Sequence, residues 1–389
     1  MKAATLPHQR PRDAKLLHVA ADGCIEHLPR SRLADLFMPG DLVVANDAAT
    51  MPASLHGVHQ RTGEPVEIRL AGRASLDVDA VHEFVAVAFG AGDHRIRTED
   101  RPSPPPLQPG DRLQLGPLAA TVVHTLGHAR LVALRFDGSA DAIWAGIARH
   151  GKPIQYAHVD TPLALWDVWT QVAALPVAFE PPSAGFVLDW ALLRALRERG
   201  IGFATLTHAA GISSTGDPLL DARLPFDEPY HLPASTVQAI AHARAVGGRV
   251  VALGTTVTRA LEHAASQGPL RSGPGLADQR IGPHTRLQVI DAIVSGTHEP
   301  GTSHYELLRA FASDDVLGRA SVELERQGYV THEFGDSVLI ERSDQAFWNL
   351  NTATLAFRLG SRRTTRPPWM PNESSTDSPV LRASTSKSA

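Results

Sequence analysis

The segment GRVVALGTTVTRALE, from Gly248 to Glu262, decides the fold class of this chain. Its apolar run RVVAL predicts a buried strand, and Gly254, Thr255 and Thr256 carry the chain directly into the next helix. Helical and strand patterns alternate from about residue 143 onward, as expected where helices cover a mixed or parallel sheet. We therefore predict an α/β protein whose main part is a discontinuous mixed α/β domain.

The turn at Gly254, Thr255 and Thr256 suits a negatively charged ligand group. A glycine lets the backbone approach closely, hydroxyls can donate, and the first N–H groups of a helix carry a partial positive charge. That charge contributes about 0.3–1 kcal/mol when exposed and up to ~2 kcal/mol when partly buried, so it can orient a ligand but cannot bind one alone. The alternative is that the threonines only cap the helix.

The pattern of predicted secondary structure changes between Gly57 and Phe136. Five short β-rich pieces, EPVEIRLAG, EFVAVAFG, DRLQLG, LAATVVHTLG and LVALRF, are separated by glycines and by the Pro-rich 101–110. Closely spaced strands without helical periodicity predict a small antiparallel barrel or sandwich. We predict an α/β domain formed by residues 1–56 and 144–345, an inserted β domain at 57–143, and a tail at 346–389 that is rich in Ser, Thr and Pro and therefore disordered.

Composition excludes several classes of protein. No apolar stretch approaches the roughly 20 residues that a membrane span needs, and Cys24 is the single cysteine, so we expect a cytoplasmic protein without disulfides. The formal charge of -4 excludes a protein that coats nucleic acid nonspecifically, because that mode depends on many Lys and Arg. Specific RNA enzymes remain possible.

Two histidines occupy loops that follow apparent strands. His208 in TLTHAAG and His298 in SGTHEPG could each reach a cleft and act as a general acid or base. For any one histidine, a surface or hydrogen-bonding role is the alternative. His298 and His304 lack the HExxH spacing, and with one cysteine present we expect no metal.

The ordered segments GDLVVAND, RHGKPI, PPSAGF, TLTHAAG, VVALGTTVTRALE and THEPGTSHYELLRAFA are more specific together than any one of them. With this order, the chain resembles the S-adenosylmethionine:tRNA ribosyltransferase-isomerases of queuosine biosynthesis from about Leu6 to Ile340. The resemblance implies that the β-rich insertion is a small β-barrel.

The resemblance also implies an activity. It is the transfer and isomerisation of the ribosyl moiety of S-adenosylmethionine onto a 7-deazaguanine base in tRNA, forming epoxyqueuosine with release of adenine and methionine. S-adenosylmethionine is then a co-substrate and no other cofactor is expected. The implied partners are S-adenosylmethionine and tRNA, and we expect a monomer without membrane contact.

Site residues follow from the same resemblance. It implies proton transfer by His208 or His298, with Glu228 as partner or alternative base, and binding of the methionine carboxylate by Thr255, Thr256 and Arg259. The full set of expected substrate-binding residues is Asn46, Asp47, Arg149, His150, Ser183, Gly254, Thr255, Thr256 and Arg259. A tRNA partner further predicts a basic surface beside the pocket, drawn from Arg95, Arg97, Arg101, Arg149 and Arg244.

Departures from the family pattern fall on the loops of the expected pocket. They are PIQYAH at 153–158, Gly296-Thr297-His298, the run from His304 to Glu306, and GISS at 211–214. Such changes on a kept framework favour an altered acceptor. Two alternatives therefore stand beside the tRNA enzyme: an S-adenosylmethionine-dependent transferase or lyase with another acceptor, and a noncatalytic nucleotide- or RNA-binding descendant.

Overall fold

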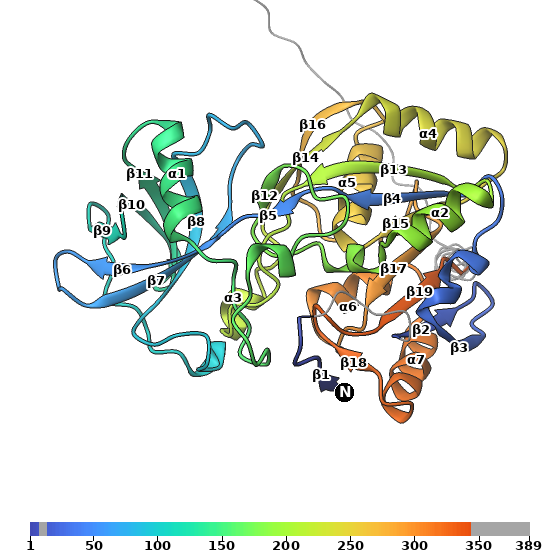
Figure 1. Cartoon of the computed structure of the whole chain (residues 1–389), viewed down its shortest axis with the longest axis horizontal. Helices are drawn as coiled ribbons and strands as arrows, with labels where there is room; N and C mark the ends of the chain where they lie inside the picture. The colour runs from blue at the N-terminus through green and yellow to red at the C-terminus, as the bar shows by residue number, and fades with distance from the viewer. Residues whose placement is uncertain (8–13, 344–389) are drawn as a thin grey trace, which may run out of the picture. The chain divides into compact units, whose positions relative to one another are not determined.

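The computed structural model describes residues 1–7 and 14–343. Its largest element is a nine-stranded sheet in the order β16-β14-β13-β4-β15-β17-β19-β2-β3 (Figure 1). The strands are β2 (Lys15–Val19), β3 (Ile25–Pro29), β4 (Leu42–Asn46), β13 (Gly202–His208), β14 (Glu228–Leu232), β15 (Val250–Leu253), β16 (Gly273–Ala277), β17 (Ala292–Gly296) and β19 (Ser337–Glu341). The four central strands β13, β4, β15 and β17 run parallel to one another. The pairings of β13 with β14, β14 with β16, β17 with β19 and β2 with β3 are antiparallel. The predicted mixed α/β fold is confirmed.

Both faces of this sheet are covered. Successive side chains of a strand point to opposite faces, and on β4 Val44 belongs to one apolar cluster while Val43 and Ala45 belong to another. The first cluster holds residues of α4 (Ala234–Ala245), α5 (Thr255–Ser266), α6 (Ser303–Leu308) and α7 (Asp314–Arg326), and the second holds residues of η1 (Arg30–Leu36) and α2 (Trp190–Glu198). Burial on both faces explains why β4 and β15 are continuous apolar runs.

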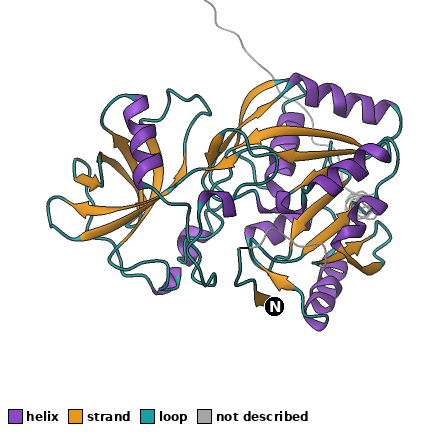
Figure 2. Ribbon diagram, in the orientation of Figure 1, coloured by secondary structure: helices purple, strands orange, loops and turns teal. Residues whose placement is uncertain are grey.

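The β-rich insertion forms a closed barrel in the order β10-β11-β8-β7-β6-β9. Its strands are β6 (Ser54–His59), β7 (Pro65–Gly72), β8 (Glu83–Phe89), β9 (Arg112–Leu115), β10 (Leu118–His128) and β11 (Leu131–Phe136). Each of the five β-rich pieces forms one of these strands, with β10 running one residue further to His128, and closure decides for a barrel over a sandwich. Helix α1 (Ala140–His150) lies on the barrel and buries Ile143 and Ile147 in the apolar cluster of the barrel strands (Figure 2).

Smaller pairings complete the connections. They are β1 (Lys2–Ala3) with β18 (Val330–Thr331), and β5 (Ala49–Thr50) with β12 (Pro176–Ala178), both parallel. A short helix, α3 (Pro218–Asp221), follows β13. Within residues 1–7 and 14–343, the helices are too short or too polar to cross a membrane. The tail expected to be disordered, 346–389, lies outside the described residues.

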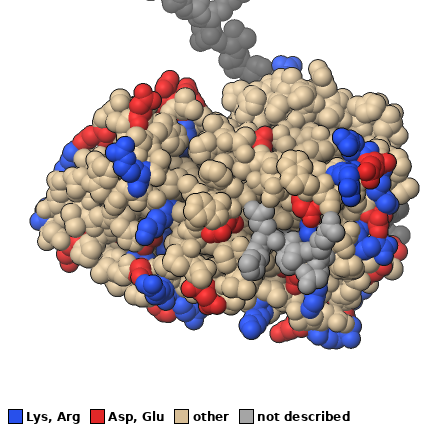
Figure 3. All heavy atoms as spheres, in the orientation of Figure 1, with Lys and Arg blue, Asp and Glu red and all other residues tan. Residues whose placement is uncertain are grey.

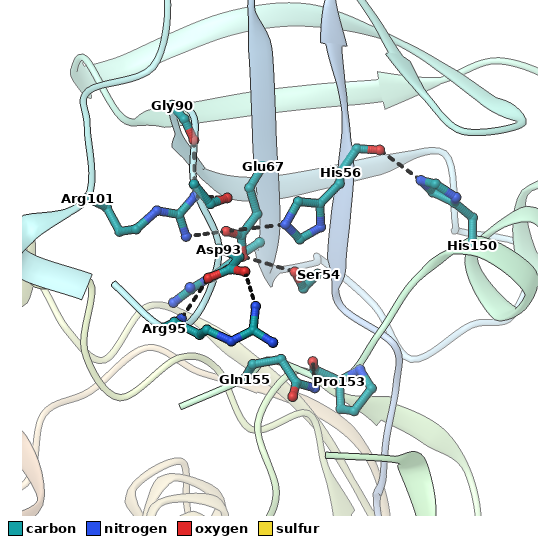
Figure 4. Close-up of polar contacts among 12 residues, drawn as sticks. Ser54, His56, Glu67, Gly90, Asp93, Arg95, Arg101, His150, Pro153 and Gln155 are labelled. Atoms are coloured by element: carbon teal, nitrogen blue, oxygen red, sulfur yellow. Dashed lines mark hydrogen bonds and ion pairs between the residues drawn. The ribbon is translucent and has the colours of Figure 1, made fainter. Parts of the chain in front are cut away.

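A buried ion-pair cluster joins β7 to the connection between β8 and β9 (Figure 4). Glu67 on β7 is 3% exposed; its Oε1 accepts from Arg69 Nε at 2.7 Å and its Oε2 from Arg101 Nη1 at 2.5 Å. The Ser54 hydroxyl donates to Oε1 at 3.0 Å. Arg101 was expected on a basic surface, but it is buried and neutralised here, so that expectation is wrong.

Removing this carboxylate should destabilise the protein in a pH-dependent way. Burial alone would raise the pKa of Glu67, but Arg69 and Arg101 outweigh it and lower the pKa from about 4.5 to about 2. A lowered folded-state pKa gives stability that is present above about pH 4.5 and is lost as pH falls toward 2. Glu67→Gln should therefore cost roughly 3 kcal/mol at pH 7, because it leaves two buried guanidinium groups uncompensated.

Urea unfolding at pH 7 and at lower pH measures this effect. The difference between wild type and Glu67→Gln should shrink as pH falls through that window. Glu83→Gln removes the exposed ion pair with Arg135 and is the matched control, for which we expect little change. A cost of Glu67→Gln that stays constant with pH would contradict the lowered pKa of Glu67.

Candidate active site

A cavity of about 540 Å³ lies at the carboxyl ends of the central parallel strands. Gly254 follows β15, Ser295 and Gly296 end β17, and Ala210 lies just beyond β13, and all of them line it. Ligands of open α/β sheets bind outside the carboxyl ends of the strands. The volume is in the range of small-molecule sites, so a nucleoside-sized ligand fits its dimensions.

The N-terminus of α5 opens into this cavity. Gly254 has φ +97°, a conformation that L side chains rarely adopt, and a Cβ added there would lie 3.0 Å from the Ala184 Cβ. Gly254 is the N-cap, without a side-chain hydrogen bond to the first turn, so the alternative that Thr255 and Thr256 cap the helix is wrong. The Thr256 hydroxyl instead accepts from Asn46 Nδ2 at 3.3 Å. The first N–H groups of an α-helix have no partner within the helix, and Thr255 and Thr256 line the cavity.

Glu228 is a buried carboxylate held in a fixed position in the cavity wall. Its Oε1 accepts from the Gly211 N–H at 2.6 Å, and its Oε2 is ion-paired with Arg259 Nη1. Burial raises the pKa of Glu228, and Arg259 opposes that rise. Arg259 also donates from Nη2 to the Ala277 carbonyl at 2.9 Å, so its guanidinium is already engaged.

His208 lies behind Glu228. We expected it just past its strand, within reach of a cleft, but it is the last residue of β13, is fully buried, and is not part of the cavity lining. Its Nε2 is 3.4 Å from Glu228 Oε2. Burial, and then the Arg259 charge, hold the pKa of His208 well below its usual value, so the ring is neutral. The inward-facing position on the strand is what removes it from the cavity surface.

His298 is the predicted histidine that lines the cavity. It follows β17, and its Nε2 lies 2.8 Å from Ser295 Oγ. Its ring is 4.8 Å from that of His304, which also lines the cavity. The hydroxyl contact orients the imidazole without burying it, which suits proton transfer.

Glu180 is a cavity residue that the sequence did not reveal. Its Oε2 accepts from the Ser213 N–H at 2.9 Å. Burial, and then the charge of Glu333, raise the pKa of Glu180 to about 8, so the carboxyl is protonated at neutral pH and can donate. Glu180 directly precedes the PPSAGF segment (Pro181–Phe186), and this position was the signal available in the sequence.

The structure gathers part of the predicted set and separates the rest. The cavity lining contains Ser183, Glu228, Gly254, Thr255, Thr256, Arg259 and His298. Asn46 and Asp47 support it from the end of β4, where Asp47 accepts from the Thr207 hydroxyl at 2.7 Å. Arg149 and His150 are on α1 outside the lining, and His150 Nε2 lies 2.7 Å from the His56 carbonyl (Figure 4).

Fold and site together define a mixed α/β protein with an inserted β-barrel and a cavity at the strand ends. The N-terminus of α5, which suits an anionic group, lines this cavity. Residues 1–340 match the family described as queuosine biosynthesis protein. The chain is 36% identical over 324 residues to the S-adenosylmethionine:tRNA ribosyltransferase-isomerase of Azoarcus sp. (strain BH72), covering 81% of this chain and 87% of that protein. It is 34% identical over 329 residues to the enzyme of the same name from Pelobacter propionicus, covering 82% and 90%. The protein belongs to the queuosine biosynthesis protein family.

A solved structure is also similar. The S-adenosylmethionine tRNA ribosyltransferase of Thermotoga maritima aligns with 87% of this chain and 96% of its own, at 24% identity and a TM-score of 0.46. The family assignment rests on the sequence matches.

Proposed function

We propose that the protein transfers and isomerises the ribosyl moiety of S-adenosylmethionine onto a 7-deazaguanine base of tRNA, releasing adenine and methionine. The names of the relatives support this activity. The observation that carries it is the convergence of the separate motif loops on one cavity, where an anion-binding helix start lies close to a histidine and two carboxyl groups.

The methionine end of S-adenosylmethionine is assigned to the start of α5. Its carboxylate would accept from the free N–H groups at Thr255 and Thr256, where the helix dipole favours negative charge. Arg259 was expected to share this role, but its guanidinium is engaged by Glu228 and by backbone carbonyls. We assign Arg259 to holding Glu228 in place.

Proton transfer is assigned to His298. The sulfonium of S-adenosylmethionine acidifies the adjacent ribose C5′ hydrogens, so the reaction needs a positioned base rather than a protein nucleophile. Glu228 is the alternative base at the same cavity. Glu180, protonated at neutral pH, is the hydrogen-bond donor available to the leaving adenine.

Two exposed arginines beside the cavity are the basic residues that support a nucleic-acid partner. On the face shown in Figure 3, Lys and Arg lie in scattered groups among Asp and Glu. Arg280 is exposed and lines the cavity, and exposed Arg223 adjoins the lining residue Ala222. We assign these two arginines to contact tRNA phosphates.

Replacing Arg280 should weaken tRNA binding without affecting S-adenosylmethionine binding. Removing one phosphate contact should make the negative slope of log affinity against log salt shallower by about 0.7–0.9. Binding of Arg280→Gln to tRNA, measured by fluorescence anisotropy at several salt concentrations, checks this. Arg194→Gln, which removes an exposed arginine on α2, is the control. An unchanged slope in Arg280→Gln would remove the contact.

Turnover with defined substrates tests the function. The protein is incubated with S-adenosylmethionine, with and without tRNA carrying the aminomethyl-deazaguanine, and adenine is measured by chromatography. Adenine release only with that tRNA is the expected result. Release without tRNA would indicate a different acceptor or a lyase, and binding without turnover would indicate a noncatalytic descendant.

A further inference from the structure

Two distant segments bring three metal-ligating side chains together outside the active-site cavity. His158 is in the loop that follows α1, and His332 and Glu333 are in the connection between β18 and β19. One ligand atom from each residue lies within 4.8 Å of the others. Across residues 1–7 and 14–343, this is the one group of three or more His, Cys, Asp or Glu side chains that meets this condition.

The distances are close to those of a metal site. His158 Nε2 lies 3.6 Å from Glu333 Oε2, and the His158 and His332 rings are stacked 4.5 Å apart at 22°. Ligand atoms of a tetrahedral zinc ion are about 3.3 Å apart, so a pair of ligand atoms at the 4.8 Å limit must close by about 1.5 Å. His332 is exposed and can rotate its ring to close that distance.

The donor set selects a class of ion. Two imidazoles and one carboxylate match transition metals such as zinc, whereas calcium and magnesium prefer oxygen ligands alone. Three protein ligands leave one position for water, and the exposure of His332 provides a path for entry. We propose that His158, His332 and Glu333 bind one divalent transition-metal ion, with Zn²⁺ as the best match. The proposal departs from the expectation from sequence that no metal is bound.

Such an ion would link the loop after α1 to the β18–β19 connection near the cavity. None of its three ligands lines the cavity, but the Glu333 charge acts on Glu180 and His304, which do. The site is separate from the proposed active site. Metal binding can therefore be measured without substrate, and its outcome is independent of the proposed function.

The test uses the full-length protein without an affinity tag. The protein is treated with chelator, exchanged into metal-free buffer and titrated with zinc sulfate by calorimetry, with visible absorbance of bound Co²⁺ as a second readout. We expect one equivalent of zinc to bind, and the melting temperature to rise with added zinc. A failure of the wild-type protein to bind a stoichiometric ion would overturn the proposal.

Variants are chosen to keep the fold. His158→Phe retains the ring stacking with His332, and His332→Asn suits its positive φ of 68°, which asparagine tolerates. Each should weaken zinc binding at least about 100-fold, because loss of a direct ligand exceeds the 10- to 100-fold cost of a supporting residue. Glu333→Gln is a third variant with the same expectation.

His231→Ala removes an exposed histidine on β14 and should bind zinc like the wild type. Circular dichroism identifies which of the three ligand variants are folded, and zinc binding is compared among those. Zinc affinity unchanged in every folded ligand variant would overturn the proposal.

Discussion

Adenine release should fall at least about 100-fold when His298 is replaced by alanine, because a positioned general acid or base contributes about 10²- to 10⁴-fold to rate. His298 lines the cavity and its ring is held by Ser295, whereas the other predicted histidine, His208, is fully buried behind Glu228. The measurement is adenine release with S-adenosylmethionine and the modified tRNA. Binding of S-adenosylmethionine should stay within a few-fold of wild type, since the proposed contacts of its methionine end are on α5.

The control for this variant is His231→Ala, which should retain full activity. His208→Ala should act through Glu228 and therefore lower both stability and rate. Full activity in His298→Ala would pass the role of base to Glu228. Full activity in both His298→Ala and His208→Ala would remove the histidines from acid–base chemistry.

The second large effect is expected at Arg259. Arg259→Met keeps the length of the side chain but leaves Glu228 buried without its cation, which should cost about 3–5 kcal/mol of unfolding free energy. The pKa of Glu228 is already raised by burial, and it rises further in this variant. A raised folded-state pKa gives stability that is present below the ordinary carboxyl pKa of about 4.5 and is lost as pH rises. The cost of the variant should therefore be smaller at pH 5 than at pH 8.

Urea unfolding at these two pH values checks the prediction. The double variant Arg259→Met with Glu228→Gln should recover part of the lost stability, since it removes the uncompensated charge. A cost that is independent of pH, and that the second substitution does not relieve, would show that Arg259 acts only by packing.

Local patterns predicted most elements of the fold. The RVVAL run and its glycine predicted β15 and the start of α5, and the five β-rich pieces predicted barrel strands. Burial on both sheet faces explains why these strands are visible as apolar runs. Closure of the barrel depends on which strands pair, and the sequence pattern alone left a sandwich open.

The site was predicted in part for the same reason. Residues that follow parallel strands, such as Gly254, Thr256 and His298, reach one cavity because the carboxyl ends of those strands share one edge of the sheet. The direction of a side chain and its partners are not local properties. His208 points into the core, and Arg259 is neutralised by Glu228 rather than left for a ligand.

The sequence by itself determined the family, the α/β sheet with its β-rich insertion, and the strand–Gly254–helix turn. Only the tertiary structure decided that Glu180 enters the cavity and that His158 meets His332 and Glu333. These contacts join loops far apart in the chain, and their geometry follows from how the strands pair and where each loop returns. Sequence periodicity records which face of an element is buried, because burial acts residue by residue along that element. It carries no record of which loop lies opposite, because that contact is made only when the folded chain brings the two segments together.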